Sequence, residues 1–208
     1  MIETSLFAQG FGLIAGVDEA GRGACAGPLV AASVAIDESS PLLQREALDS
    51  KKFKPAQREE LFDLILASSK ATHVVAISSQ DIDRFGLQAM NISAMRRAVA
   101  GLGIDVDYLI SDGYPVTGVN MPTLAMFKGD SLSVAVGAAS IIAKVTRDRI
   151  MMEMEERFPG YGFGSHKGYS SALHMKAIAD LGVTEIHRTS YRNVAELVQM
   201  KSEIHNQI

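Results

Sequence analysis

The sequence predicts an α/β protein with a five-stranded mixed sheet flanked by helices. Three apolar runs typical of strands occupy residues 13–18, 29–36 and 73–78, and only a short turn separates the first two. A doubly wound fold alternates strand and helix from its start, whereas here two strands come before the first long helix. A hairpin start followed by later helical crossovers therefore indicates a mixed sheet.

The other elements follow from periodicity and from the residues that begin or end them. Pro55 suits the first turn of a helix, whereas Gly103, Pro159 and Gly182 each follow the end of a helical pattern. Asp81 and Asp83 indicate a polar turn. In chain order we expect a helix over 55–67, a helix over 87–102, strands over 106–111 and 123–127, a long helix over 134–158, a loop over 161–169, a helix up to 181 and a final helix over 194–208.

Composition is that of a single soluble domain. The 208 residues are 47% hydrophobic, with a formal net charge of -4 and a pI of about 5.7. Bulk charge thus does not indicate a nucleic-acid partner, and any such role requires a local basic patch. The lone Cys25 excludes an internal disulfide and fits a reducing compartment. Without a basic leader or a bilayer-length apolar run, we expect a cytoplasmic protein that does not contact membranes.

The stretch 14–23 places charge at the end of a strand. Asp18 and Glu19 follow an apolar run, and two glycines flank Arg22. Successive side chains of a strand point to opposite faces, so we expect the strand to stop here if both carboxylates act together. Gly21 and Gly23 allow a sharp turn and a close approach of backbone to a ligand. This combination suits a phosphate group and a hard cation.

Two other interpretations compete for this stretch. Acidic residues and glycines are common in ordinary turns at strand ends. In addition, Gly21, Gly23 and Ala26 fit the G-x-G-x-x-G/A fingerprint of dinucleotide-binding proteins, with Asp37 near the expected ribose-binding acid. That motif must open a helix, however, and Pro28 followed by a strand-like run leaves no room for one. Strand, short turn and strand is the better interpretation.

Two further carboxylates lie just beyond predicted strands. Taken singly, Asp112 is typical of a turn before glycine, and Asp130 of a helix cap. Together with Asp18 and Glu19 they would crowd one edge of a sheet, which is unfavourable unless a cation binds or one carboxyl stays protonated. Mg²⁺ prefers such oxygen ligands, whereas the cysteine and histidine spacing does not match a zinc site. The sequence therefore favours phosphoryl-transfer chemistry with a hard cation.

An ordered set of short motifs resembles the bacterial ribonuclease HII family. The matching segments are GVDEAGRG at 16–23, AGP at 26–28, DSKK at 49–52, DG at 112–113, KGD at 128–130, AASIIAKVTRD at 138–148, YGF at 161–163, HKGY at 166–169 and IHR at 186–188. Each is weak alone, but the ordered set is specific. The resemblance implies a single domain over 1–208 with a ribonuclease H-like fold, its catalytic core at about 10–160 and a helical C-terminal part at about 161–208.

The resemblance also implies an activity. We expect an endoribonuclease that hydrolyses the RNA strand of RNA·DNA hybrids and incises 5′ to single ribonucleotides embedded in duplex DNA, as in ribonucleotide excision repair. Two Mg²⁺ or Mn²⁺ ions would serve the reaction, which leaves 3′-hydroxyl and 5′-phosphate ends. A monomer is expected. The alternatives are a non-catalytic module that binds hybrids, or a related metal-dependent nuclease or phosphatase.

Site residues carry over by motif match. Asp18, Glu19, Asp112 and Asp130 take the places of the four catalytic, metal-associated carboxylates. The loop of Gly21, Arg22 and Gly23 matches the segment that contacts the ribose 2′-hydroxyl and neighbouring phosphate, and Tyr169 the tyrosine that checks the RNA-to-DNA junction. Candidates for phosphate contact, with a solvated surface or an ion pair as the alternative, are Lys51, Lys52, Lys144, Arg147, Lys167, Arg188 and Arg192.

Overall fold

A computed structural model describes residues 2–45, 48 and 50–205, and the chain divides into two compact units. The first unit comprises Met1–Ala20, Val30–Ala76 and Asn91–Thr146, and the second Gly21–Leu29, Ile77–Met90 and Arg147–Ile208. The second unit thus combines the C-terminal part of the chain with two earlier segments. Among the described residues, no helix combines the length and the apolar character needed to cross a membrane.

The mixed five-stranded sheet is confirmed. The apolar runs form its strands, which lie in the order β3-β2-β1-β4-β5. β1 is antiparallel to β2 and parallel to β4, and β4 is parallel to β5. Their bounds are Ile14–Ala20 for β1, Leu29–Ile36 for β2, Ala71–Ile77 for β3, Tyr108–Asp112 for β4 and Thr123–Met126 for β5.

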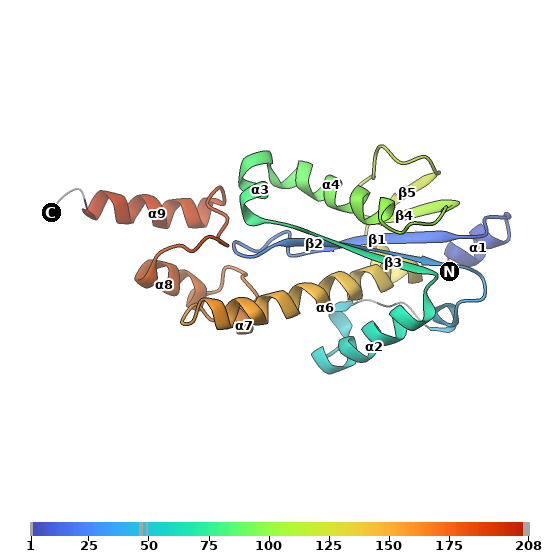
Figure 1. The fold of residues 1–208 in the computed structure, drawn as a ribbon, viewed down its shortest axis with the longest axis horizontal. Coiled ribbons are helices and arrows are strands. Elements are labelled where there is room, and N and C mark those ends of the chain that lie inside the picture. Colours follow the sequence, from blue (N-terminus) through green and yellow to red (C-terminus); the bar gives the residue numbers. More distant parts are fainter. Residues whose placement is uncertain (1, 46–47, 49, 206–208) are drawn as a thin grey trace. The chain divides into compact units, whose positions relative to one another are not determined.

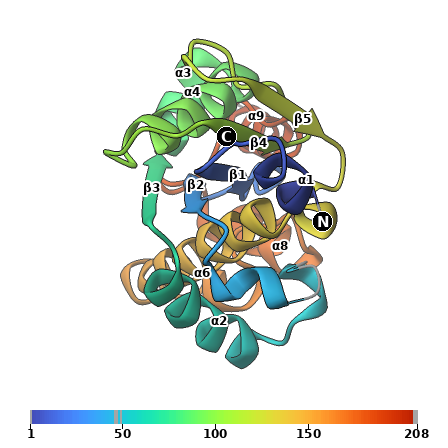
Figure 2. The same cartoon turned by 90° about the vertical axis from the view of Figure 1, so that its right-hand side faces the viewer.

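Helices cover both faces of this sheet. α4 (Leu87–Ala100) lies on one face, and α6 (Val134–Arg157) with α2 (Pro55–Ser68) on the other (Figures 1 and 2). Every residue of β2 is buried, which is why its sequence is a continuous run of apolar and small residues without alternation. The sheet is therefore the middle layer of the first unit.

The first turn of α6 lies directly against β1. A Cβ atom on Gly16 would stand 2.1 Å from the carbonyl carbon of Ala135, closer than two such atoms can come. Gly16 still pairs with Val34 of β2, and its carbonyl oxygen also accepts a hydrogen bond from Ser33 Oγ at 3.0 Å. Glycine at position 16 thus sets the distance between the central strand and α6.

The structure corrects the expected end of the first strand. β1 continues through both carboxylates to Ala20, because Glu19 and Ala20 still pair with Ala31 and Val30 of β2. Asp18 and Glu19 therefore belong to one regular strand, in which adjacent side chains point to opposite faces. The expectation that the strand stops at the carboxylates is wrong, and the turn begins only at Gly21.

The short helices at residues 79–85 and 2–7 were not expected. α3 (Ser79–Phe85) replaces the predicted polar turn, and the Ser78 side chain caps it by accepting a hydrogen bond from the Asp81 backbone N–H. α1 (Ile2–Phe7) packs through Leu6 against the first unit's core. Both are too short for helical periodicity to reveal them.

The second unit is built around the segment 21–29 and the C-terminal helices. These are α7 (Phe163–His166), α8 (Ala172–Leu181) and α9 (Arg192–His205). Its apolar core includes Cys25, Met151, Phe163, Ile178 and Val194. α7 lies inside the expected loop, whereas α8 ends at Leu181 as predicted.

Glu3 provides an unexpected link within the first unit. Its fully buried carboxylate accepts hydrogen bonds from Ser133 Oγ at 2.6 Å and from the Ala135 backbone N–H at 3.1 Å. These donors lie at the N-terminus of α6, where the helix dipole favours a negative charge. The carboxylate therefore caps the helix that supports β1.

We predict that Glu3→Ala lowers the free energy of unfolding by about 2 kcal/mol, because it leaves buried donors at the start of α6 unpaired. Urea denaturation followed by circular dichroism measures this change. Glu38→Ala, at an exposed position, is the control and should change stability by less than about 0.5 kcal/mol. Equal urea midpoints for the two variants would contradict the capping role.

Candidate active site

Topology brings the carboxylates to one edge of the sheet. β1, β4 and β5 are parallel, so their carboxyl ends lie at the same edge. Val17 pairs with Ser111, and the next positions along the two strands are Asp18 and Asp112. Asp130 follows the end of β5 by four residues. The fold thus gathers at this edge the acidic residues that the sequence places after separate strands.

Asp18 is the most constrained of these groups. Its side chain is 5% exposed, accepts a hydrogen bond from the Glu19 backbone N–H at 2.7 Å and is hydrogen-bonded to the Ser140 hydroxyl of α6. The pKa of Asp18 is raised well above its ordinary value by burial, and further by repulsion from the carboxylates of Glu19 and Asp112. Three negative groups therefore lie within electrostatic reach of one another.

Ser140 is a site residue that sequence reasoning missed. Its hydroxyl oxygen lies 3.0 Å from Ser50 Oγ, so the two serines form a buried pair behind Asp18. Both serines belong to segments that resemble the ribonuclease HII family, 49–52 and 138–148, and this resemblance was the one sequence signal for them. A serine within a small-residue helix face nevertheless gives no sign of the strand that it will contact.

Asp112 is held by the turn that leads to Asp130. Lys128 has a left-handed backbone conformation (φ 57°) and precedes α5 (Gly129–Leu132). This conformation directs the Gly129 N–H to Asp112 Oδ1 at 2.7 Å. A Cβ on Gly129 would lie 3.3 Å from the same oxygen and 3.1 Å from Val136 Cγ1. The Lys-Gly-Asp motif therefore orients one carboxylate and supplies the next.

Gly137 permits the close approach of Asp130 to α6. A Cβ at position 137 would stand 2.8 Å from the Asp130 carbonyl oxygen and 2.8 Å from Leu48 Cβ. Asp130 itself is 4% exposed. A larger residue in α6 would therefore displace the backbone that carries this carboxylate.

In the second unit, the structure brings the glycine loop and Tyr169 together. Gly21 has φ +88°, and a Cβ there would lie 1.9 Å from Arg147 Nε. Tyr169 is 42% exposed, and its Cε1 atom is 3.9 Å from the Cβ position of Gly23. Arg22 Nη2 donates a hydrogen bond to Gln88 Oε1 at 2.9 Å. The loop thus presents backbone beside a half-exposed aromatic ring.

Arg147 supports this loop from inside. Its side chain is fully buried and donates hydrogen bonds to the carbonyl oxygens of Ala26, Pro28 and Lys167 at 2.9–3.1 Å. The guanidinium carbon lies 5.5 Å from the centroid of the Tyr169 ring. Burial lowers the pKa of Arg147 to about 10, so the group remains charged at neutral pH.

Arg188 has the same role. It is fully buried and donates to the Gly27 carbonyl oxygen through Nε and Nη2, at 3.1 and 2.9 Å, and to the Arg22 carbonyl oxygen through Nη1 at 3.1 Å. The expected contact of Arg147 and Arg188 with phosphate is therefore wrong as a direct contact. Both guanidinium groups face loop carbonyls, not solvent.

The remaining basic candidates differ in exposure. Lys52 is exposed and Lys144 half-buried, so both remain candidates for phosphate contact. The Lys167 ammonium group donates a hydrogen bond to a backbone carbonyl oxygen of α7. Arg192 forms a salt bridge with a glutamate one turn further along α9. The side chain of Lys51 lies outside the described residues.

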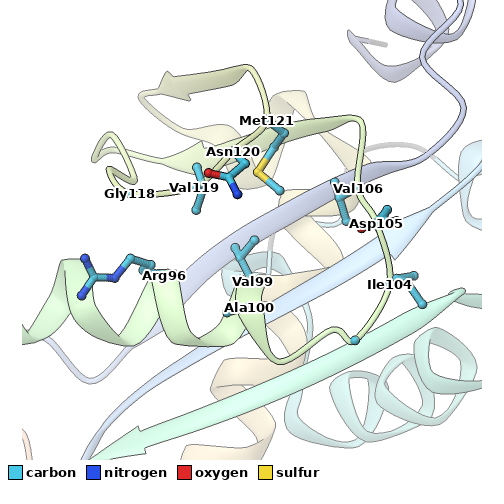
Figure 3. A pocket seen from close by; sticks show the side chains of 11 residues that line it. Arg96, Val99, Ala100, Ile104, Asp105, Val106, Gly118, Val119, Asn120 and Met121 are labelled. Atoms are coloured by element: carbon cyan, nitrogen blue, oxygen red, sulfur yellow. The ribbon is translucent and has the colours of Figure 1, made fainter.

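A cavity of about 610 Å³ lies elsewhere in the first unit (Figure 3). Arg96 and Val99 of α4 line it, with Asp105 before β4 and Met121 before β5. These segments precede the strands, whereas the carboxylates follow them. The cavity is therefore at the opposite edge of the sheet and does not belong to the carboxylate site.

A five-stranded mixed sheet of this order, with carboxylates at the ends of β1 and β4 and after β5, defines a protein of the ribonuclease H-like class. Residues 15–194 match the family described as Ribonuclease HII. The chain belongs to the ribonuclease HII family, and it is a ribonuclease H hydrolase that acts on RNA in RNA·DNA hybrids.

Similar proteins agree with this assignment. A ribonuclease HII of Cutibacterium acnes is 47% identical over 96% of this chain and 98% of its own length, and one of Mycolicibacterium vanbaalenii is 48% identical over 95% and 79%. The ribonuclease H2 structure of Pyrococcus horikoshii has a TM-score of 0.80 at 26% identity, covering 92% of this chain and 99% of that one. Ribonuclease HII in a PCNA complex from Archaeoglobus fulgidus has a TM-score of 0.76 at 27% identity, with coverage of 88% and 96%.

We predict that Gly137→Ala lowers kcat/KM for hybrid cleavage on the order of tenfold, because the added methyl group displaces the Asp130 backbone. A fluorescent hybrid assay with a Mg²⁺ titration measures the change. Gly164→Ala is the matched control, since a Cβ there meets no atom closer than 3.4 Å. Unchanged kinetics for folded Gly137→Ala would show that the close approach is not needed.

Proposed function

We propose that this chain incises duplex DNA on the 5′ side of single embedded ribonucleotides, in addition to cleaving hybrids, with two Mg²⁺ or Mn²⁺ ions and with 3′-hydroxyl and 5′-phosphate products. The observation that carries the metal part is the raised pKa of Asp18, caused by burial and by the carboxylates of Glu19 and Asp112. Divalent cations would remove this repulsion.

The donor set fits hard divalent cations. All four proposed ligands, Asp18, Glu19, Asp112 and Asp130, offer carboxylate oxygens, which Mg²⁺ and Mn²⁺ prefer. Across the part of the chain that the structure describes, no three acidic, histidine or cysteine side chains are grouped closely enough to hold an ion as they stand. Because like charges repel, the carboxylates would have to turn toward a cation to share it.

The bound ions would supply an activated water and stabilise the leaving 3′-oxygen. The chain's own contribution is to orient the carboxylates before substrate arrives. The Glu19 N–H and the Ser140 hydroxyl fix Asp18, and the Gly129 N–H fixes one oxygen of Asp112. Such hydrogen bonds from strand ends and a helix restrict how these two carboxylates can turn toward a cation.

Recognition of a ribonucleotide requires a group that senses the 2′-hydroxyl, which distinguishes RNA from DNA. The loop of Gly21, Arg22 and Gly23 could do so through backbone hydrogen bonds, since its glycines leave the backbone accessible. Tyr169, with its half-exposed ring beside Gly23, is proposed to pack on the next sugar at the junction.

A cleavage assay on end-labelled duplex DNA with one ribonucleotide tests the proposal, run with Mg²⁺, Mn²⁺ and chelator beside an all-DNA duplex. Incision 5′ to the ribonucleotide that requires metal, with the DNA control intact, is the expected result. Cleavage of hybrids without incision at the embedded ribonucleotide would contradict the proposed activity on single ribonucleotides. Binding without any incision would favour the non-catalytic module.

We predict that Asp18→Asn reduces cleavage more than about a thousandfold and leaves hybrid affinity nearly unchanged, because a metal ligand is lost but phosphate contacts remain. Single-turnover kinetics and fluorescence anisotropy separate the two quantities. Asp105→Asn, at the opposite edge of the sheet, is the control. Normal turnover of Asp18→Asn at saturating Mg²⁺ would argue against the ligand assignment.

We predict that Tyr169→Ala lowers cleavage at single-ribonucleotide junctions about tenfold or more, with a smaller effect on continuous hybrids, because packing on a sugar or base contributes roughly 1–3 kcal/mol. The ratio of kcat/KM for the two substrates is the readout. Phe85→Ala, which removes another exposed aromatic ring, serves as the control. An equal loss on both substrates would exclude a junction-sensing role.

A further inference from the structure

The backbone of Tyr169 is held by a buried histidine that has no part in the proposed reaction. The Tyr169 carbonyl oxygen accepts a hydrogen bond from the Ser171 N–H at 2.8 Å and lies 3.0 Å from His174 Nδ1. The Tyr169 N–H donates to the His166 carbonyl oxygen at 3.0 Å. These contacts hold the backbone from which the half-exposed ring projects.

His174 belongs to a directed chain of hydrogen bonds that begins at Thr184. The Thr184 backbone N–H donates to His187 Nδ1 at 2.8 Å, so this nitrogen carries no proton. A neutral His187 therefore has its proton on Nε2, which lies 3.1 Å from His174 Nε2. His174 Nε2 must then accept, and the proton of His174 is on Nδ1, facing the Tyr169 carbonyl oxygen.

Both tautomers are thus fixed by backbone groups at the two ends of the chain, an N–H at Thr184 and a C=O at Tyr169. A second proton on His174 would place two N–H groups against each other at 3.1 Å. A second proton on His187 would oppose the Thr184 N–H at 2.8 Å, and would have to leave this contact for Thr184 Oγ1 at 2.9 Å. The complete relay from the Thr184 N–H through His187 and His174 to Tyr169 therefore requires both imidazoles to be neutral.

The surroundings keep the pair neutral. His174 is fully buried and His187 is 2% exposed, and burial lowers the pKa of each to about 4, with a charge on His174 lowering that of His187 further. The titratable or charged groups that surround the pair are the Cys25 thiol 3.5 Å from His174 Nδ1, the His166 ring stacked at 4.3 Å, the Tyr161 ring 5.3 Å from His187, and Arg188, next to His187 in the chain.

We propose that His174 and His187 are positioning residues for Tyr169, whose relay of hydrogen bonds holds the junction-reading ring in place only while both imidazoles are neutral. The inference rests on the proposed role of Tyr169 in substrate recognition. It predicts that discrimination between junction and hybrid substrates depends on two side chains that never contact the nucleic acid.

Three variants separate this role from simple packing. His174→Leu removes the hydrogen bond to the Tyr169 carbonyl, and the junction-to-hybrid ratio of kcat/KM should fall about tenfold, as for Tyr169→Ala. His174→Asn can place an amide N–H where Nδ1 lies and should recover most of the ratio. In His187→Gln the side-chain amide can still donate to His174, so the ratio should stay near that of the parent at neutral pH.

The pH profile supplies a readout that packing alone would not move. In the parent the ratio should stay level from pH 8 to about 5.5 and fall below that, as the imidazoles begin to bind a second proton near their pKa of about 4. Protonation of the site carboxylates at low pH lowers kcat/KM for both substrates alike, so this loss cancels in the junction-to-hybrid ratio. In His187→Gln the amide can turn and accept from protonated His174, so the ratio should hardly change with pH.

The same pair makes stability depend on pH. Unfolded histidines bind protons near pH 6.5, whereas the folded pair does so only at about 4. Above pH 6.5 the two histidines are neutral in both the folded and the unfolded chain, so they do not make the free energy of unfolding depend on pH. Between pH 6.5 and 4 only the unfolded chain binds the protons, so the free energy of unfolding falls progressively. Urea unfolding should show a smaller loss over this range for His187→Gln than for the parent.

Long-range ¹H–¹⁵N NMR of the two imidazoles tests the relay without any substrate. The expected result is a proton on Nδ1 of His174 and on Nε2 of His187, with a shift of the Tyr169 ring resonances in His174→Leu. The opposite tautomers, or a His174→Leu ratio equal to the parent's while Tyr169→Ala lowers it, would overturn the proposal. If Tyr169→Ala leaves the ratio unchanged, the proposed role of Tyr169 fails, and the NMR result still decides whether the relay exists.

Discussion

The close packing of α6 on β1 at Gly16 is the constraint on which the carboxylate site depends. No side chain fits between the strand and the Ala135 backbone, so the helix lies as near to the sheet as two backbones can. At that distance Ser140, five residues further along α6, reaches Asp18, and Gly137 lets the Asp130 backbone approach. A helix set further away would leave both carboxylates without these contacts.

Much of this arrangement is predictable from local sequence. β2 begins and ends at the predicted residues, and α2, α4 and α6 begin where Pro55, Leu87 and Val134 indicated. The end of β1 was not predictable, because Glu19 continues the strand only through pairing with Ala31 of β2, and pairing is a property of the partner strand. Local signals specify elements, whereas register decides on which face each carboxylate lies.

The buried arginines show a second limit. A basic residue in a nucleic-acid enzyme is reasonably expected to contact phosphate, and nothing near Arg147 or Arg188 in the sequence argues otherwise. Most of their acceptors are carbonyl oxygens of the segment 22–28, more than a hundred residues away along the chain. The Glu3 cap of α6 escaped prediction for the same reason, since its donors Ser133 and Ala135 are distant in sequence.

The two arginines also explain how a loop with few side chains can be rigid. The segment 21–29 buries Cys25 and Ala26 in the core of the second unit, and guanidinium groups hold carbonyl oxygens of its turn in place of a sheet partner. Charged donors make stronger hydrogen bonds than neutral ones, and the acceptors of these hydrogen bonds are carbonyl oxygens, which carry no net charge. Arg147 stays protonated at neutral pH despite its burial. Positive potential therefore lies beneath the backbone amides of this loop, which favours an anionic backbone there without any side chain touching a phosphate.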